Sequence, residues 1–392
     1  MDLQSSGSAG RERPRGASLH QLLVSRRIGG AAFIGMRLAR AGARRGWPGT
    51  TWVPGPGPAA DAAAREGLAH RVIELEATDT RRRARLFTCG RLFGTLVGEA
   101  QPIVHVHNGF MWGLVRPALI AAGARTVVHF HLDPSEAEIA WTLKRSPTHI
   151  VTCARYIAAQ VEAVAKAHAV DVPVIAVPNA VDVDRFQPGD RLAARRRIGA
   201  GTPESFVVLM LANLAPHKGQ ATALRALHRM RLQGMQAECW LAGEDRAGRG
   251  DHLRTLQALA ADLGVSDHVR FLGFRDDAAD LLRAADAVVL PSTHEGLPLS
   301  LLEAQAARVP VVASDVPGVL EIIEDGRTGF VIPADDAEGY AHRLMLLARQ
   351  PEIRERVTVA AADHVTREHS WVTFEDRMFD VYRTVATQHG AS

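Results

Sequence analysis

The sequence predicts an α/β protein made of two doubly wound, parallel-sheet domains. The chain has 392 residues, more than one ordinary hydrophobic core holds. Apolar residues make up 47% of it and aromatic residues only 5%, a balance typical of Ala-, Val- and Leu-rich α/β proteins. Short continuous apolar runs alternate along the chain with longer runs of helical period. Strands of this kind are buried on both faces, so we expect each parallel sheet to be covered by helices on both sides.

The first block of this alternation opens with an apolar strand at 17–25. The loop 26–30 follows, and an Ala-rich helix then runs to about Gly46. Further strands are predicted at 50–54, 71–75, 102–107, 125–131, 148–153 and 173–179. Helical stretches, such as 155–169, separate most of them.

The second block shows the same alternation more clearly. Strands are predicted at 205–213, 237–243, 268–273, 286–291 and 309–314. Helices are predicted at 218–233, 251–263, 277–285, 298–307 and 371–386. Two doubly wound domains, one for each block, are the arrangement that this order of elements favours.

The stretch 178–190 separates the two blocks, because it carries prolines toward both ends and has little periodicity. We expect residues 1–16 to form a disordered tail and 17–185 to form the N-terminal domain. We expect 186–370 to form the C-terminal domain, and the helix within 371–392 to pack back on the N-terminal domain.

Composition argues against several classes of protein. The polar N-terminus lacks an apolar signal core, and no run of about 18 uncharged apolar residues occurs, so we expect neither secretion nor a membrane span. Cys89, Cys153 and Cys239 are scattered and form no C-x-x-C pair. This pattern argues against a disulfide framework and a Cys-rich zinc site, and it favours a reducing compartment. We therefore expect a cytoplasmic protein.

The charge is spread unevenly. Residues 1–100 contain 16 arginines and no lysine against 8 acidic residues, whereas the whole chain has a net charge of +3. A basic first part predicts a surface that meets an anionic partner. The stretch 81–100 begins with arginines and continues with apolar residues at helical spacing. It is either a basic amphipathic helix that contacts an anionic membrane, at the inner face of the plasma membrane, or a core helix with a solvated basic end.

Two glutamates frame the turn after the predicted strand 286–291. Glu295 precedes Gly296-Leu297-Pro298, and Glu303 lies one to two turns inside the helix that follows. In open parallel sheets, ligands bind beyond the carboxyl ends of the strands, and free amides at a helix start attract anions. The alternative is that Glu303 is a solvated helix residue and Glu295 a favourable charge near the helix N-terminus.

Lys218 stands at the corresponding exit of the strand 205–213. It is one of three lysines in a chain with 43 arginines, and it is followed by Gly219 at a predicted helix start. A lysine in this place is a good ligand for a diphosphate. A lysine that merely faces water is the alternative.

Taken together, these stretches resemble the retaining glycosyltransferases of family 4. The segment 294-HEGLPLSLLEAQ-305 resembles the family's E-x7-E signature, and 213–219 resembles its phosphate-binding strand exit. Further stretches resemble other family motifs in the same order: Gly29-Gly30, 178-PNAVDVDRF-186, 241-LAGE-244 and 312-VASDVPGVLEII-323. The resemblance covers nearly the whole chain. It implies the GT-B fold, in which two Rossmann-like domains face a central cleft.

The resemblance also implies roles for individual residues. Glu295 and His131 would act at the reacting sugar, Glu303 would bind the ribose hydroxyls, and the loop glycines would allow close approach of donor or acceptor. The implied diphosphate ligands are Lys218, Asn213 and the segment of Gly296, Leu297 and Leu299; the loop glycines are Gly29 and Gly30.

The sequence departs from the family pattern at three positions. Asn213 stands where the family usually has arginine, so one diphosphate cation is missing or is supplied elsewhere. Ala180 replaces a common glycine and Ala32 a frequent glutamate, and both changes look tolerable.

The implied activity is transfer of a sugar from a UDP- or GDP-sugar to a glycan or lipid-linked acceptor, with retention, in the synthesis of cell-surface polysaccharide or glycolipid. Lysine and a helix N-terminus would neutralise the departing diphosphate. We expect no cofactor, no divalent metal and no nucleic-acid partner. A nucleotide-sugar epimerase and a non-catalytic nucleotide-sugar-binding protein are the alternatives. A nicotinamide dehydrogenase is disfavoured, because no G-x-G-x-x-G follows an early strand and 55-GPGP-58 is broken by proline.

Four histidines form two H-x-H pairs, at His105 and His107 and at His129 and His131. The members of each pair share one face of a strand. Two readings are open: a metal site, which acidic partners at matching positions do not support, or cleft-lining and packed histidines.

Overall fold

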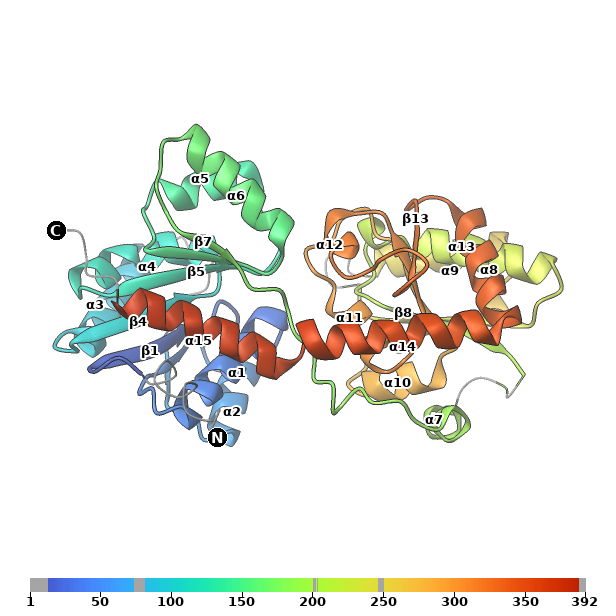
Figure 1. Ribbon diagram of the computed structural model, residues 1–392, viewed down its shortest axis with the longest axis horizontal. Helices are drawn as coiled ribbons and strands as arrows, with labels where there is room; N and C mark the ends of the chain where they lie inside the picture. The colour runs from blue at the N-terminus through green and yellow to red at the C-terminus, as the bar shows by residue number, and fades with distance from the viewer. Residues whose placement is uncertain (1–12, 74–81, 200–201, 203, 246–249, 388–392) are drawn as a thin grey trace, which may run out of the picture. The chain divides into compact units, whose positions relative to one another are not determined.

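The computed structural model describes residues 13–73, 82–199, 202, 204–245 and 250–387, without the side chains of 82–85. The chain forms two compact units (Figure 1). One runs up to Val177 and resumes at Glu375, and the other spans Pro178–Phe374. Of the predicted tail 1–16, residues 1–12 lie outside the described ranges.

The N-terminal unit is built on a seven-stranded sheet whose pairs are all parallel. Its strands are β1 (Ala17–Leu22), β2 (Thr51–Val53), β3 (His70–Val72), β4 (Gln101–Val106), β5 (Arg125–Phe130), β6 (His149–Thr152) and β7 (Val174–Ala176). Its helices are α1 (Gly30–Arg44), α2 (Pro58–Arg65), α3 (Arg82–Leu96), α4 (Gly109–Ala121), α5 (Glu136–Leu143), α6 (Arg155–Ala167) and the later part of α15 (Trp371–Thr387).

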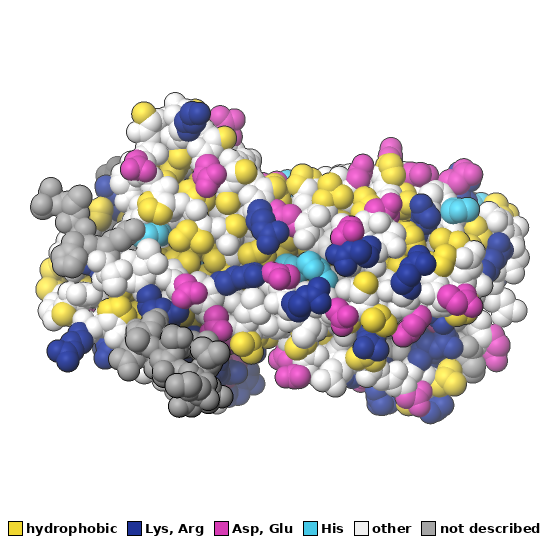
Figure 2. All heavy atoms as spheres, in the orientation of Figure 1, with side chains coloured by type: hydrophobic (Ala, Val, Ile, Leu, Met, Phe, Trp, Pro, Cys, Tyr) yellow, Lys and Arg dark blue, Asp and Glu magenta, His cyan; other side chains and the backbone are white. Residues whose placement is uncertain are grey.

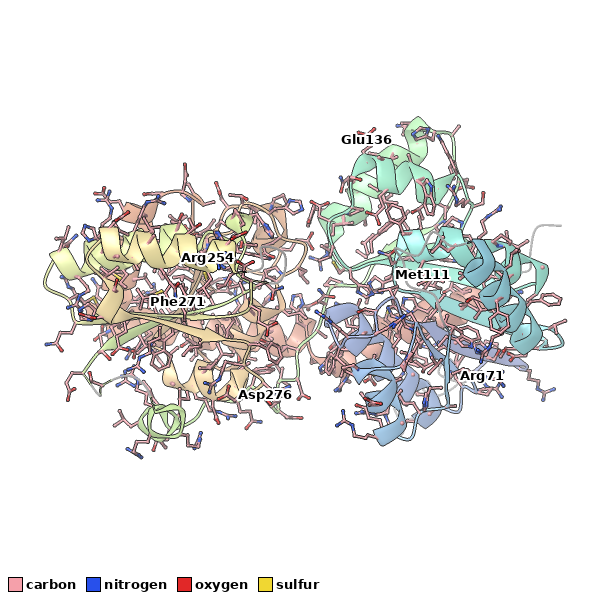
Figure 3. All side chains as sticks on the ribbon, turned by 180° about the vertical axis from the view of Figure 1, so that it is seen from behind. Arg71, Met111, Glu136, Arg254, Phe271 and Asp276 are labelled. Carbon is pink, nitrogen blue, oxygen red and sulfur yellow. The ribbon has the colours of Figure 1, made fainter. Side chains whose placement is uncertain are left out.

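Apolar runs in the strands make the core of this unit. Val104 and Val106 of β4 and Leu22 of β1 are fully buried with Met111 of α4, whose side chain Figure 3 labels. The polar anchor of α15 is Glu375, which is 6% exposed and forms ion pairs with arginines of α1 and its C-cap. The last turns of the chain therefore belong to the N-terminal unit.

The C-terminal unit holds a six-stranded parallel sheet. Its strands are β8 (Phe206–Leu211), β9 (Ala237–Ala242), β10 (Val269–Gly273), β11 (Ala287–Leu290), β12 (Val311–Ser314) and β13 (Phe330–Ile332). Its helices are α7 (Arg191–Ile198), η1 (Pro216–Lys218), α8 (Gln220–Leu232), α9 (Asp251–Asp262), η2 (Ser266–His268), α10 (Ala278–Ala284), α11 (Leu299–Ala306), α12 (Pro317–Leu320), α13 (Ala337–Arg349) and α14 (Pro351–Glu368).

Both sheets reverse their strand order at one point. The orders are β3-β2-β1-β4-β5-β6-β7 and β10-β9-β8-β11-β12-β13, so the reversals lie between β1 and β4 and between β8 and β11. The chain leaves the carboxyl ends of two such strands in opposite directions, which opens a crevice for ligands. We therefore expect a ligand site at the loops that follow these four strands.

The buried ion pair of the C-terminal unit lies at the other end of its sheet. Arg195 donates to Asp286 over 2.6 Å, and both side chains are 3% exposed. The same carboxylate accepts the backbone N–H of Val207 over 2.7 Å. Because all three groups stand where β8 and β11 begin, this pair fixes the amino edge of the sheet.

Four elements after β12 were not predicted from the sequence, namely α12, β13, α13 and α14, and neither was α7. The first two have only four and three residues, and α14 has four buried side chains among 18 residues, which give a weak apolar period. The helix predicted after β8 started too early. Gly219, with φ of 79°, ends the short turn η1, and α8 begins only at Gln220.

Candidate active site

The exit loops of β8 and β11 are joined directly. The backbone N–H of Thr293 donates to the carbonyl of His217 over 2.8 Å. A Cβ at Gly219 would lie 1.9 Å from the carbonyl oxygen of Pro291. Glycine is therefore required here both for its positive φ and for this close approach. This contact places the side chains of Lys218 and Glu295 beside each other.

Lys218 and Glu295 form a two-pronged ion pair. The ammonium Nζ lies 2.8 Å from Oε1 and 2.9 Å from Oε2 of the carboxylate. Glu295 is 8% exposed and Lys218 is 21% exposed. The pair is partly desolvated and holds an ammonium group at the crevice. Glu295 balances the charge of this ammonium until another anion competes for it.

The loop after Glu295 is held from the linker between the two blocks. The amide Nδ2 of Asn179 donates to the carbonyl of Leu297 over 3.1 Å, and the carbonyl of Asn179 lies 2.9 Å from Nδ1 of His369. Gly296 and Leu297 are buried. Pro298, predicted as the first residue of this helix, is its N-cap, and α11 begins at Leu299. The amides of its first turn have no acceptor within the helix.

Glu303 is the fifth residue of α11 and is only partly exposed. Burial raises the pKa of its carboxyl to about 7, and the charge of Arg185 acts against this rise. Burying the charged form of this carboxyl costs free energy, and ligand hydroxyl groups that donate hydrogen bonds to it would lower that cost.

Asn213 is exposed at the end of β8, and its carbonyl accepts a hydrogen bond from Nε2 of Gln220 over 2.9 Å. Gln220 is buried, so this bond ties the start of α8 to the strand exit. The loop that carries Lys218 is therefore held at both ends.

In the N-terminal unit, Gly29 is the N-cap of α1 and Gly30 its first residue. A Cβ at Gly29 would meet nothing within 4 Å, and its φ of −118° suits any residue. Packing within the described chain does not explain a glycine here. The open space beside its backbone fits the predicted approach of a ligand.

The four histidines lie together at the carboxyl ends of β4 and β5. The rings of His105 and His107 stack with centroids 4.0 Å apart, and those of His129 and His131 with centroids 3.8 Å apart. Across the strands, Nε2 of His105 lies 3.2 Å from Nδ1 of His129, and Nδ1 of His107 lies 2.8 Å from Nε2 of His131. Burial lowers the pKa of all four imidazoles, that of His131 to about 3, so the cluster is neutral.

Three of these rings, His105, His107 and His129, are close enough to hold a metal ion. Both nitrogens of His105 and both of His107 are already engaged in hydrogen bonds, with Tyr382, Gln21 and the facing histidines. A metal would have to break these bonds, so the residues present fit a hydrogen-bonded cluster better.

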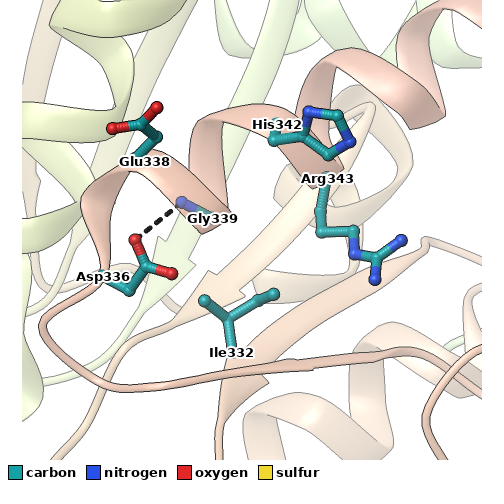
Figure 4. A pocket seen from close by; sticks show the side chains of 6 residues that line it. All are labelled: Ile332, Asp336, Glu338, Gly339, His342 and Arg343. Carbon is teal, nitrogen blue, oxygen red and sulfur yellow. Dashed lines mark hydrogen bonds between the residues drawn. The ribbon is translucent and has the colours of Figure 1, made fainter.

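A hollow of about 500 Å³ lies elsewhere in the C-terminal unit, at the edge strand β13 (Figure 4). Ile332, Asp336, Glu338, Gly339, His342 and Arg343 line it. Asp336 caps α13 by accepting the N–H of Gly339 over 2.8 Å. None of the predicted donor-binding residues is among those lining residues.

The structure brings Lys218, Glu295 and the Gly296–Leu297 loop together, with Glu303 on the helix that the loop begins. Gly29, Gly30 and His131 lie in the other unit, at its own carboxyl edge. Sequence reasoning missed the support that Asn179 gives to Leu297. It also missed Gln21 as a partner of His107, because 86 positions separate the two residues.

Two family models match the chain. The model described as "Glycosyltransferase Family 4" matches residues 28–185, and the model described as "Glycosyl transferases group 1" matches residues 194–364. The two matches follow the two blocks seen in the sequence.

Relatives of known activity are similar over different lengths. The phosphatidyl-myo-inositol mannosyltransferase of Mycobacterium leprae is 31% identical over 295 residues, which cover 73% of this chain and 74% of that protein. The D-inositol 3-phosphate glycosyltransferase of Saccharomonospora viridis is 36% identical over 210 residues, 52% of this chain and 48% of that protein. The chain therefore spans about half the length of the D-inositol 3-phosphate glycosyltransferase that it matches.

Solved structures share the fold. Anabaena HepE in complex with UDP superposes with a TM-score of 0.82 at 19% identity, over 94% of this chain and all of that chain. A glycosyltransferase from Rickettsia africae gives a TM-score of 0.82 at 17% identity, over 95% and 99% of the two chains. The predicted fold class, two doubly wound parallel-sheet domains of the GT-B type, is confirmed.

Proposed function

Because the chain belongs to glycosyltransferase family 4, we propose that it moves a sugar from a nucleoside diphosphate sugar to a hydroxyl acceptor with retention of the anomeric configuration. The donor is a UDP- or GDP-sugar. The ion pair of Lys218 and Glu295 at the strand-order reversal of the C-terminal unit carries this proposal.

The ion pair supports separate roles for Lys218 and Glu295 in binding the donor. A diphosphate that enters the crevice competes with Glu295 for the Lys218 ammonium, and the freed carboxylate then faces the sugar that the diphosphate carries. Amides of Gly296, Leu297 and Leu299 at the start of α11 bind phosphate or sugar oxygens. Glu303 accepts from the ribose hydroxyls, and Asn213 lies exposed beside the diphosphate.

The proposed reaction depends on neutralising the charge of the diphosphate leaving group. The bond from the anomeric carbon to the diphosphate oxygen breaks, and its electron pair goes to the diphosphate, whose charge Lys218 and the helix start stabilise. The acceptor hydroxyl attacks from the same face, and its proton passes to the departing diphosphate. No carboxylate nucleophile is required, unlike in retaining hydrolases. We assign Glu295 to the donor sugar, and we keep for His131, in the other unit, the role that the family resemblance implies.

The names of the relatives narrow the acceptor. They describe transfer to inositol 3-phosphate and to phosphatidyl-myo-inositol. We therefore place the acceptor among phosphorylated or lipid-linked polyols and glycans, as in the synthesis of cell-surface glycolipid or polysaccharide.

A peripheral contact with an anionic membrane would use α3. Leu86 and Phe87 on this helix are 73% and 65% exposed, whereas Leu92 and Leu96 are fully buried, so α3 has both a core side and an exposed apolar end. The side chains of 81–85, where the predicted basic segment begins, lie outside the described residues. On the face shown in Figure 2, basic side chains lie among acidic ones rather than in one area. Among the described helices, none has the length and apolar character to cross a bilayer.

A two-step experiment tests the proposed function. UDP-, GDP- and ADP-sugars are first screened for a rise in the melting temperature of the full chain. The best donor, labelled in its sugar, is then incubated with inositol 3-phosphate or with phosphatidylinositol vesicles. Label in the acceptor supports transfer. Conversion of the donor to its epimer without an acceptor would establish the epimerase alternative, and binding without turnover would establish a non-catalytic protein.

A further inference from the structure

The histidine cluster of the N-terminal unit is a continuous hydrogen-bonded chain that ends on His131. Oε1 of Gln21 lies 2.8 Å from Nε2 of His107, and Nδ1 of His107 lies 2.8 Å from Nε2 of His131. At the end of the chain, Nδ1 of His131 is buried and has no hydrogen-bond partner among the described residues.

The chemistry of these groups fixes where each proton resides. In this structure Oε1 of Gln21 faces Nε2 of His107, and an amide oxygen only accepts, so with this amide orientation Nε2 of His107 carries the proton of the bond. A neutral imidazole has one N–H, so Nδ1 of His107 accepts. The proton between the two rings therefore belongs to Nε2 of His131, and Nδ1 of His131 is left as a lone pair.

We propose that Gln21 and His107 are positioning residues that hold His131 as the Nε2–H tautomer, so that its Nδ1 accepts a hydrogen bond from a hydroxyl group of the bound sugar or acceptor. This inference rests on the proposed function for the identity of that hydroxyl. The tautomer itself is a property of the free protein.

The surroundings hold the chain in place. Gln21 on β1 stands beside β4, in register with His105, and the N–H of His107 donates to the carbonyl of Leu22 over 3.3 Å. A Cβ at Gly35 of α1 would lie 2.8 Å from Nε2 of His107, so α1 packs closely over the imidazole. Burial keeps His107 and His131 neutral, as tautomer selection requires.

A second, parallel chain runs through the other two rings. The hydroxyl of Tyr382 lies 2.7 Å from Nδ1 of His105, which reaches His129 through its Nε2. Tyrosine can donate or accept, so this chain does not select a tautomer by itself. The amide oxygen of Gln21 is what makes the His107 chain directional.

The test reads the tautomer directly. Protein labelled with 15N only in histidine is examined by long-range 1H–15N correlation, which distinguishes protonated from unprotonated ring nitrogens. His131→Asn identifies the His131 signals. We compare wild type with Gln21→Leu, which removes the acceptor, and with Gln21→Asn, which keeps a neutral amide. His168→Gln, at an exposed histidine of the same unit, is the matched control.

We expect wild-type His131 to carry its proton on Nε2, and Gln21→Leu to give a mixture of tautomers. In transfer assays Gln21→Leu should lower kcat roughly 10-fold with little change in the KM of the donor, and Gln21→Asn should lower it less. A wild-type proton on Nδ1, an unchanged tautomer in Gln21→Leu, or an unchanged kcat would overturn the proposal.

Two further readouts keep the outcomes separate. Zinc is added at one equivalent, and a shift of the His105, His107 and His129 signals would show a metal site and overturn the proposal. Thermal unfolding identifies a variant that fails to fold, and His107→Gln then replaces it, since it removes the ring link to His131. If the tautomer is as expected but no donor is turned over, the proposed function fails while the tautomer assignment stands.

Discussion

The two units place opposite kinds of chemistry at equivalent points of their sheets. At the reversal between β8 and β11, an ammonium and a carboxylate face each other in a charged pair. At the reversal between β1 and β4, the polar groups are an amide and stacked imidazoles that burial keeps uncharged. The same fold thus provides one charged edge and one neutral edge.

The difference shows how a doubly wound domain is specialised. A diphosphate carries several negative charges, and a fixed cation with a helix start attracts it. A sugar hydroxyl carries none, and a directed lone pair recognises it without the desolvation cost of a second charge. We therefore expect changes at the charged edge to act on the donor diphosphate and changes at the neutral edge to act on orientation.

The largest expected effect is at Glu295. In Glu295→Gln the carboxylate is lost while the side chain keeps its shape, so kcat should fall by about 10³-fold, the scale of a group that acts in the transition state. The measurement is steady-state transfer with the best donor. Glu338→Gln, at a carboxylate that is 79% exposed in the same unit, is the control. Turnover like wild type in Glu295→Gln would remove its catalytic role.

Lys218→Ala should weaken donor binding by about 10- to 100-fold, because one charge-assisted contact to the diphosphate is lost. The change should appear mainly in the KM of the donor. Lys166→Ala removes an exposed lysine of α6 and should leave KM unchanged. An equal change in both variants would mean that only net charge matters.

Gly29→Ala separates ligand contact from folding. The added methyl group meets nothing within 4 Å, so the melting temperature should stay within about 2 °C of wild type. Transfer should fall roughly 10-fold, because the methyl group occupies space that we assign to the ligand. Unchanged transfer would leave Gly29 without a role at the neutral edge.

Glu303→Gln should change the pH dependence of stability. Burial raises the pKa of this carboxyl from 4.5 to about 7, so the native protein holds a proton that the unfolded chain has released. The free energy of unfolding of wild type therefore falls as pH rises between these values. Relative to wild type, Glu303→Gln should gain about 1–3 kcal/mol between pH 5 and pH 8 in urea unfolding. A constant difference would contradict the shifted pKa.

The smallest effect is expected from Asn213→Arg. Restoring the arginine that is usual at this place adds a cation at an exposed position of the charged edge, so donor affinity should rise about 2- to 5-fold at low salt and less at high salt. Calorimetric titration of UDP at two salt concentrations measures it. A loss of affinity would show that another group occupies the place of the arginine.

Sequence reasoning reached the charged edge because its signals are local. Strand exits, Gly219 and the start of α11 all follow from short stretches, and they place Lys218 and Glu295 at one end of a sheet. The neutral edge depends on partners that are far apart in the chain. Gln21 and His107 are separated by 86 positions, and His105 and Tyr382 by 277, so no local pattern pairs them. The raised pKa of Glu303 likewise arises from burial, which the sequence did not reveal.

One measurement tests the contrast between the two edges most directly. UDP and GDP are titrated calorimetrically, in the presence of EDTA, into wild type, Lys218→Ala and His131→Ala. We predict that wild type binds at least one of the two without a divalent ion, that Lys218→Ala loses about 10-fold or more in affinity, and that His131→Ala keeps the wild-type value. An equal or larger loss in His131→Ala, or none in Lys218→Ala, would contradict the account.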